Sequence, residues 1–503
     1  MGNFLLIYPT QITEAPMTLA MLGAVIKQEG YQVHTCINTF AKPLGVEDFV
    51  RKAIEVKADY VGISMLTFRV LFVYDIVREL KSHGFKVILG GPHPTDCPEE
   101  GIEAGADIVV VGEGEETIRE ILSGKPLTEI LGIVTKDFKT GKRPRLDIDT
   151  LPLPDVEIFD PQQFLDEEGF VKGFHRIYTS RGCPGLCTFC DWKVFGQKFK
   201  EYDIRAVVDE IKRRRDIYGL RSFSLADDCF TVNAERVFEF CRLIKGQGVN
   251  WRANSRANLV TEKMLQAMKD SGCHSVAFGL ESGDPETLRK IAKGVTLEEN
   301  IMAPKLAHKV GLEVYGCLMT GFPWETPANV ENQIKFIHEL WDDVSLFQVS
   351  GSLMPFPGAP IYRKYAPVYG FDKYWLKPDY QNFGIQVYQN AVNPFAVSTF
   401  YQRYLFDDTY IRDEYFFRYT PEYKQAVRRL VKEIGRHNLR FMFQGQPRKQ
   451  QLYLAVANVS MAVSNIFPNL EKKVGGAIFH GRSQIERIRD KRRGIALKYT
   501  NPN

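Results

Sequence analysis

The chain has 503 residues, 44% hydrophobic and 25% charged, which excludes a single core and predicts two or three globular domains. The first residues show no signal peptide and no apolar run reaches about 18 residues, so we expect a cytoplasmic protein without a transmembrane segment. Net charge is +4, and Lys+Arg outnumber Asp+Glu by 20 to 9 in residues 401–503. We interpret this excess as solvated helix faces, with an anionic partner as the alternative, and expect no nucleic-acid partner.

Residues 3–135 alternate between short apolar strands and amphipathic helices. Strands that alternate with helices predict a parallel sheet covered on both faces, so we expect a doubly wound, Rossmann-like α/β domain over residues 1–140. Ligands of such sheets bind beyond the carboxyl ends of the strands. The loops at those ends have the sequences PTQIT, SMLTF, GGPHP and GEGEE.

A Pro-rich segment, LPLPDVEIFDP, lies within a predicted linker at 141–172. A second alternation of about six β/α units follows at 173–365 and predicts a partial (β/α)6, TIM-like barrel with its chemistry at the C-terminal mouth. Beyond it the alternation stops. We expect a mostly helical C-terminal extension at 366–503, related to the substrate, with helices at 421–444 and 446–464.

Three cysteines stand together in the loop after the first barrel strand. Cys183, Cys187 and Cys190 have the spacing C-x3-C-x2-C. A four-iron cluster usually takes four thiolates, so three would leave one iron open to another ligand. Zinc is the alternative, but it requires four ligands, and no second C-x2-C or suitably spaced histidine is present. The other six cysteines are scattered in apolar surroundings and are predicted to be core residues.

The cysteine spacing, with Phe189 before the last cysteine, resembles the radical S-adenosylmethionine (SAM) superfamily. The resemblance implies a [4Fe-4S] cluster whose open iron binds the amino and carboxylate groups of SAM, and reductive cleavage to a 5′-deoxyadenosyl radical. It also implies SAM contacts after later strands. These are Asp227 and Asp228 in LADDCF, Arg256 in SRAN, Glu281 and Ser282 in FGLESGD, and Gly321 and Pro323 in LMTGFPWET.

The first domain resembles the cobalamin-binding subgroup of that superfamily. The resemblance implies cobalamin contacts in the strand-end loops, at Ser64, Thr67, Gly90, Gly91, Pro92, Gly112, Glu113 and Gly114. The D-x-H-x-x-G motif that supplies a histidine to cobalt is absent, which leaves the lower cobalt ligand open. The alternative is a flavodoxin-like domain that binds another nucleotide or only packs. A G-x-G-x-x-G fingerprint after the first strand is missing, which disfavours NAD.

The two cofactors together predict C-methylation of an unactivated carbon through methylcobalamin. The first alternative is a non-methylating radical cyclase or rearrangement enzyme of the anaerobic porphyrin-ring cyclase type, and the second is a cobalamin or iron–sulfur sensor. The resemblance implies an electron donor such as flavodoxin or ferredoxin. The substrate is not defined by the sequence; a lipid, a porphyrin, a peptide or another secondary-metabolite precursor would suit the aromatic-rich extension. No catalytic side chain is assigned.

Overall fold

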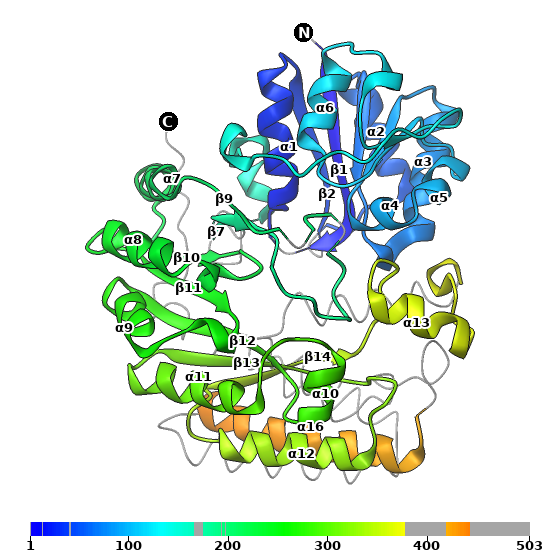
Figure 1. Ribbon diagram of the computed structural model, residues 1–503. Coiled ribbons are helices and arrows are strands. Elements are labelled where there is room, and N and C mark those ends of the chain that lie inside the picture. Colours follow the sequence, from blue (N-terminus) through cyan, green and yellow to red (C-terminus); the bar gives the residue numbers. More distant parts are fainter. Residues whose placement is uncertain are drawn as a thin grey trace.

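The computed structural model describes residues 2–377, apart from 13, 40–41, 165–174, 193 and 197, together with residues 419–442. Two six-stranded sheets organise these residues, and the first sheet lies above the second in Figure 1. None of the helices in these ranges combines the length and the apolar character needed to cross a membrane.

The first sheet has the strand order β2-β1-β3-β4-β5-β6, in which β1 to β5 are parallel and β6 is antiparallel to β5. Its side chains alternate between two cores: Phe4 and Leu6 face α1 and α6, whereas Leu5 and Ile7 face α2 and α3. The elements are β1 (Asn3–Ile12), α1 (Met17–Gln28), β2 (Gln32–Thr39), α2 (Val46–Glu55), β3 (Tyr60–Ser64), α3 (Val70–Ser82), β4 (Val87–Gly90), α4 (Pro92–Asp96), α5 (Pro98–Glu103), β5 (Ile108–Val110), α6 (Glu115–Leu122) and β6 (Ile133–Val134).

The second sheet is parallel throughout, with the order β14-β13-β12-β11-β10-β7. Because the described strands do not pair β14 with β7, the barrel is open. Its elements are β7 (Arg176–Ile177), α7 (Ile204–Tyr218), β10 (Ser222–Leu225), α8 (Ala234–Ile244), β11 (Asn250–Ser255), α9 (Glu262–Asp270), β12 (Cys273–Glu281), α10 (Pro285–Lys290), α11 (Leu297–Lys309), β13 (Glu313–Thr320), α12 (Pro327–Glu339) and β14 (Leu346–Ser352).

Further short elements connect or follow the two sheets. A two-stranded antiparallel ribbon consists of β8 (Ser180–Arg181) and β9 (Lys200–Glu201), and helices α13 (Pro360–Tyr369) and α16 (Pro421–Met442) follow the barrel. The 3-10 turns are η1 (Thr67–Arg69), η2 (Leu127–Glu129), η3 (Ile148–Thr150), η4 (Val156–Ile158), η5 (Pro161–Phe164), η6 (Phe230–Val232), η7 (Ala257–Leu259) and η8 (Tyr374–Leu376).

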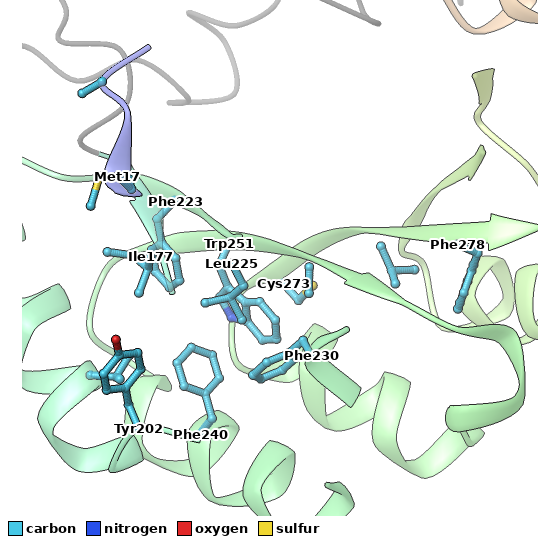
Figure 2. Close-up of a cluster of buried hydrophobic side chains, with 14 of the residues drawn as sticks. Met17, Ile177, Tyr202, Phe223, Leu225, Phe230, Phe240, Trp251, Cys273 and Phe278 are labelled. Atoms are coloured by element: carbon cyan, nitrogen blue, oxygen red, sulfur yellow. The ribbon is translucent and has the colours of Figure 1, made fainter. Parts of the chain in front are cut away.

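The outward side chains of the barrel strands form an aromatic core under the helices (Figure 2). The Trp251 ring from β11 meets the Phe240 ring of α8 edge-on at 5.1 Å between centroids, and Phe230 lies 5.3 Å from Phe240. All three side chains are essentially buried. Since strand residues alternate between faces, burying this face leaves the opposite face of β10, β11 and β12 for the barrel interior.

Helix α16 covers the edge of the barrel sheet, and it lies beside α12 at the bottom of Figure 1. Asn438 of α16 pairs with the backbone of β14: its Oδ1 accepts from the Phe347 N–H at 2.9 Å, and its Nδ2 donates to the Phe347 carbonyl at 2.7 Å. The Asn438 side chain therefore pairs with the backbone N–H and carbonyl groups at the edge of β14, as a neighbouring strand would.

These elements confirm the predicted α/β class, with a doubly wound domain followed by a partial barrel. The antiparallel β6 and the β8–β9 ribbon are additions that the sequence did not predict. The expected helix at 421–444 is observed as α16, and the one at 446–464 lies outside the described residues. The domain limits at 140, 172 and 365 stay predictions.

The predicted linker contacts the first domain. Lys27 of α1 forms an ion pair with Asp155 of the linker at 2.6 Å, so this segment is held against the first domain.

Candidate functional site

A cavity of about 1070 Å³ lies where the two sheets face each other. Its wall combines the strand-end loops of the first domain, the cysteine loop and the inward-facing residues of the barrel strands. Both predicted cofactor regions therefore open onto one space.

The cysteine loop is held open by backbone geometry. Cys183, Cys187 and Cys190 all line the cavity. Gly182 has φ +83°, and a Cβ there would lie 2.8 Å from the Lys198 carbonyl, so this position requires glycine. The β8–β9 ribbon pairs the two ends of the loop, which brings Gly182 next to Lys198, 16 residues further along the chain.

The donor set fits an iron–sulfur cluster better than a single zinc ion. Zinc–sulfur bonds of about 2.3 Å would bring the sulfurs within about 4 Å of one another. Among the described residues, only His93, Cys97 and Glu100 have their ligand atoms gathered within 4.8 Å, so the three loop sulfurs are not all this close, although the Cys187 and Cys190 thiols contact each other. Arg256 also donates to the Cys187 sulfur at 3.7 Å, which places a positive charge beside an anionic cluster.

A lysine that the sequence did not single out lies at the same place. The Lys293 ammonium donates to Glu281 Oε1 at 3.0 Å, and both side chains are nearly buried at the cavity wall. Burial lowers the pKa of Lys293, but the charges of Glu281 and Cys187 and the hydrogen bond to Glu281 together outweigh it, so the net shift is upward and the ion pair is retained. Arg256 binds the Lys293 carbonyl. Lys293 lies in the turn between α10 and α11, where no motif marked it.

The two adjacent aspartates have different surroundings. Asp228 lines the cavity with an exposed side chain. Asp227 is 1% exposed and is absent from the cavity wall. Its carboxylate accepts from the Thr179 N–H at 2.7 Å, from the Thr179 hydroxyl at 2.5 Å and from the Ser180 hydroxyl at 2.7 Å. The structure thus gives Asp227 the role of joining β10 to the start of the cysteine loop.

The remaining predicted SAM residues divide in the same way. Glu281 and Arg256 line the cavity, whereas Ser282, Gly321 and Pro323 do not. Ser282 is buried and its hydroxyl accepts from the Asp284 N–H at 3.1 Å, which makes it part of the turn into α10. Gly321 N–H donates to Glu325 at 2.7 Å. Contacts from these three residues to SAM stay predictions.

The predicted cobalamin residues all lie on the cavity wall. They are Ser64, Thr67, Gly90, Gly91, Pro92, Gly112, Glu113 and Gly114. Gly91 has φ +110°, and a Cβ there would lie 2.8 Å from the Met65 carbonyl, so the close approach of β3 and β4 requires glycine. At Gly112 a Cβ would meet no atom within 4 Å, so a side chain there would occupy the cavity itself. These glycines form a cradle suited to a large, flat ligand.

Histidine is absent from the cavity wall as far as the chain is described. His93, in the GGPHP loop, is fully buried behind that wall, with the Thr67 hydroxyl 3.2 Å from its Nδ1 and Glu100 3.4 Å from its Nε2. The sequence left the lower cobalt ligand open, and the described residues offer no imidazole for it.

A buried ion-pair network joins the cobalamin loop to the cysteine loop. Arg181, next to Gly182, lies 2.7 Å from Glu115 and 3.4 Å from Glu113, and donates to the Tyr202 hydroxyl at 2.8 Å. Arg145 from the predicted linker lies 2.9 Å from Glu113. Burial lowers the pKa of Arg181, but Glu115, Tyr202 and Glu113 raise it overall, so the guanidinium stays charged. Sequence reasoning missed Arg145 and Arg181.

A doubly wound domain that faces a three-thiolate loop across one cavity defines a class of enzymes with two cofactors at the mouth of a partial barrel. The chain matches the family models of the radical SAM superfamily at residues 177–337 and of the B12 binding domain at residues 11–122. The protein belongs to the cobalamin-binding radical SAM superfamily, and its cofactors are a [4Fe-4S] cluster, SAM and cobalamin.

Three similar proteins support this membership. A protein of Pyrococcus horikoshii named as an uncharacterized methyltransferase is 33% identical over 70% of this chain and 78% of its own. The anaerobic magnesium-protoporphyrin IX monomethyl ester cyclase of Cereibacter sphaeroides is 24% identical over 71% of this chain and 62% of its own. The solved structure of the cobalamin-dependent SAM radical enzyme OxsB, with aqua-cobalamin and SAM bound, shares the fold with a TM-score of 0.65 at 16% identity, covering 98% of this chain and 81% of that one.

Proposed function

We propose that this radical SAM enzyme transfers a methyl group to an unactivated carbon of its substrate. The main observation in support of this proposal is that the cysteine loop and the glycine cradle of the first domain line a single cavity. When bound, the cluster would supply the electron that cleaves SAM to a 5′-deoxyadenosyl radical. Cobalamin would supply a methyl group that can be transferred. The similarity to a protein named as a methyltransferase supports the same reaction.

The polar residues of the cavity wall have separable roles in this proposal. Asp228, Arg256 and Glu281 are the predicted SAM residues that reach the cavity, and we assign them the contacts to the amino group, the carboxylate and the ribose of SAM. Lys293 holds the Glu281 carboxylate in place at 3.0 Å. Asp227 lies behind the cavity wall and has a positioning role, because its carboxylate binds Thr179 and Ser180 at the base of the cysteine loop.

Aromatic side chains close much of the remaining wall. Phe189 and Trp192 belong to the cysteine loop, and Phe68 and Phe356 meet edge-on at 5.6 Å between centroids. An apolar wall of this kind excludes water, which protects a reactive carbon centre from side reactions. It also accommodates the apolar part of a substrate.

A second candidate is a radical cyclisation without methyl gain, favoured by the similarity to the magnesium-protoporphyrin cyclase. A third candidate, a cobalamin or iron–sulfur sensor, leaves the predicted SAM-binding residues at the barrel mouth unexplained. The electron donor that we propose is of the flavodoxin or ferredoxin type, in the cytoplasm. All nine cysteines lie among the described residues and none is in a disulfide, as a reducing compartment favours.

The test uses the anaerobically reconstituted holoenzyme with reductant, SAM deuterated in its methyl group, and a small-molecule extract of the native organism. We expect release of 5′-deoxyadenosine and one product that gains a deuterated methyl group. Deoxyadenosine release with an unlabelled product would overturn methylation in favour of cyclisation. No deoxyadenosine under any condition would support the sensor. The Cys190→Ala enzyme serves as the background control.

A further inference from the structure

The turn between α10 and α11 places a lysine against the cysteine loop. The Ile291 carbonyl accepts from the N–H of Thr188, which lies between two of the cluster cysteines, at 2.8 Å. The Lys293 carbonyl accepts from Arg256, whose guanidinium also donates to the Cys187 sulfur at 3.7 Å. Through these bonds the turn and the cysteine loop hold each other in place, so the position of the Lys293 ammonium is set together with that of the thiolates.

The backbone departs from ordinary geometry to bring Lys293 to the cavity wall. Ala292, directly before it, has φ +51°, and its partner Glu281 has φ +61°. Residues other than glycine rarely adopt these angles, and only two others do so in the part of the chain that the structure describes. The pairing of β12 with β13 also shifts register between Gly279 and Glu281, as at a β-bulge. Strained angles and bulges gather where a side chain is aimed for function, so they point to a role for this ion pair.

Glycine makes room for the ion pair. A Cβ at Gly279 would lie 2.6 Å from Glu281 Oε1 and 3.1 Å from Lys293 Nζ, so a larger residue would displace the Glu281 carboxylate. Lys293 is only 5% exposed, and its ammonium lies 3.0 Å from that carboxylate. Buried ion pairs often add no net stability over apolar residues of similar volume. Stability alone therefore does not explain why the chain keeps two charges at this point of the cavity wall.

Charges near an iron–sulfur cluster change how readily the cluster is reduced. Reduction adds one electron, and no bond forms or breaks, so a nearby cation favours the reduced state and a nearby anion favours the oxidised state. The Cys187 charge contributes to the raised pKa of Lys293, so the ammonium and this cluster ligand are close enough to interact. Lys293 and Glu281 have opposite charges, so each partly cancels the effect of the other.

We propose that Lys293 makes the cluster easier to reduce: its ammonium, placed by the strained turn and moderated by Glu281, raises the reduction potential of the cluster held by Cys183, Cys187 and Cys190. The electron comes from the flavodoxin- or ferredoxin-type donor proposed above. The inference concerns only the cluster, and it does not depend on whether a methyl group is transferred.

The test is a potentiometric titration of the anaerobically reconstituted enzyme, with cobalamin bound and SAM left out so that Glu281 has no other ligand. Dithionite supplies the electrons, and the EPR signal of the reduced cluster reports the ratio of reduced to oxidised cluster. Lys293→Met should lower the potential and Glu281→Gln should raise it. Each should change that ratio about tenfold at a fixed potential, which is about 59 mV for one electron.

Two further variants separate charge from structure. The double variant with Lys293→Met and Glu281→Gln restores the net charge and should titrate close to the wild type. Lys293→Arg keeps the cation and should do the same. The matched control is Lys309→Met, which removes an exposed lysine of α11 paired with Glu262 at 2.7 Å and should leave the potential unchanged.

Equal potentials in wild type, Lys293→Met and Glu281→Gln would overturn the proposal, and so would shifts of both variants in the same direction. If Lys293→Met does not hold a cluster, Glu281→Gln alone decides: an upward shift supports the proposal, and an unchanged or lower potential overturns it. Opposite shifts in an enzyme whose product gains no methyl group would keep this inference and remove the proposed function.

Discussion

The thiol groups of this chain differ in ways that follow from their surroundings. Burial raises the pKa of Cys241 to about 11 and that of Cys273 still further, so both stay protonated in the core at neutral pH. Cys183, Cys187 and Cys190 open onto the cavity beside Arg256 and Lys293. Of these two groups, the loop cysteines are the ones that face the cavity where a cluster would lie.

Replacing Cys183, Cys187 or Cys190 with Ala should therefore abolish the brown cluster absorbance and SAM cleavage together. Cys241→Ala and Cys273→Ala remove a small buried side chain and should cost only about 1 kcal/mol while keeping both signals. Absorbance spectra, iron analysis and 5′-deoxyadenosine release of anaerobic preparations measure this. A core variant as damaging as a loop variant would show that the ligands are misassigned.

Sequence spacing was informative at this scale only where ligands come from one loop. The three cysteines lie within eight residues, so their pattern alone predicted the cluster site. Lys293 meets Glu281 across 12 residues and a turn, and the conformation of that turn is set by packing. Asp227 and Asp228 are equivalent in sequence, but the burial of one and the exposure of the other depend on where β10 ends.

At the scale of elements, helix α16 and Tyr419, two residues before it, brace the loop between β13 and α12. The Tyr419 hydroxyl donates to the Gly321 carbonyl at 2.5 Å, and the Tyr423 hydroxyl donates to Glu325 at 2.6 Å. Gly321 belongs to the loop that the family resemblance places beside the adenine of SAM. A segment from the C-terminal extension thus supports a loop of the barrel mouth, a link that no local pattern could predict.

This brace should make stability depend on pH. Burial raises the pKa of Glu325 to about 7, although hydrogen bonds from Tyr423 and from the Gly321 and Phe322 N–H groups oppose the shift. The pKa of Glu325 is higher in the folded state than in the unfolded state. Its contribution to the free energy of unfolding is therefore complete below about pH 4.5 and is lost as the pH rises through 7. Glu325→Gln should remove this loss and gain about 2 kcal/mol over wild type between pH 5 and 8, a value reduced for partial exposure.

Urea unfolding of the barrel transition at several pH values measures the difference. Glu331→Gln, which alters an exposed pair with Arg429 on the same two helices, is the matched control and should follow the wild-type pH profile. Parallel profiles for wild type and Glu325→Gln would show that Glu325 titrates normally.

Element type was predictable wherever strands and helices were long enough to show their period. The alternation of about six β/α units was predicted from pattern, and the structure shows it in long elements such as β12 (Cys273–Glu281) and α7 (Ile204–Tyr218). Strands β6, β8 and β9 have two residues each, and such short strands carry no alternation. Their pairing partners, and not their own sequences, make them strands.

At the scale of the whole molecule, the relative placement of the two domains depends on contacts between distant segments. The GEGEE loop and Arg181 are more than 60 residues apart, yet Glu113 and Glu115 meet Arg181 in a buried network. The resemblance predicted both domains, but a single sequence holds no information on which buried charges pair across them. This network fixes the glycine cradle against the cysteine loop.

Replacing Arg181 with Met tests that coupling. Removing the cation leaves Glu113 and Glu115 buried with only Arg145 nearby, which should destabilise the native state by about 3–5 kcal/mol and lower cobalamin retention. Adding Glu115→Gln to Arg181→Met should restore part of the loss, because one uncompensated charge is removed. Cobalamin per chain after gel filtration and the urea midpoint measure both effects, with Arg205→Met at an exposed pair as the control. Wild-type cobalamin content and midpoint in Arg181→Met would mean that the domains hold their arrangement without this network.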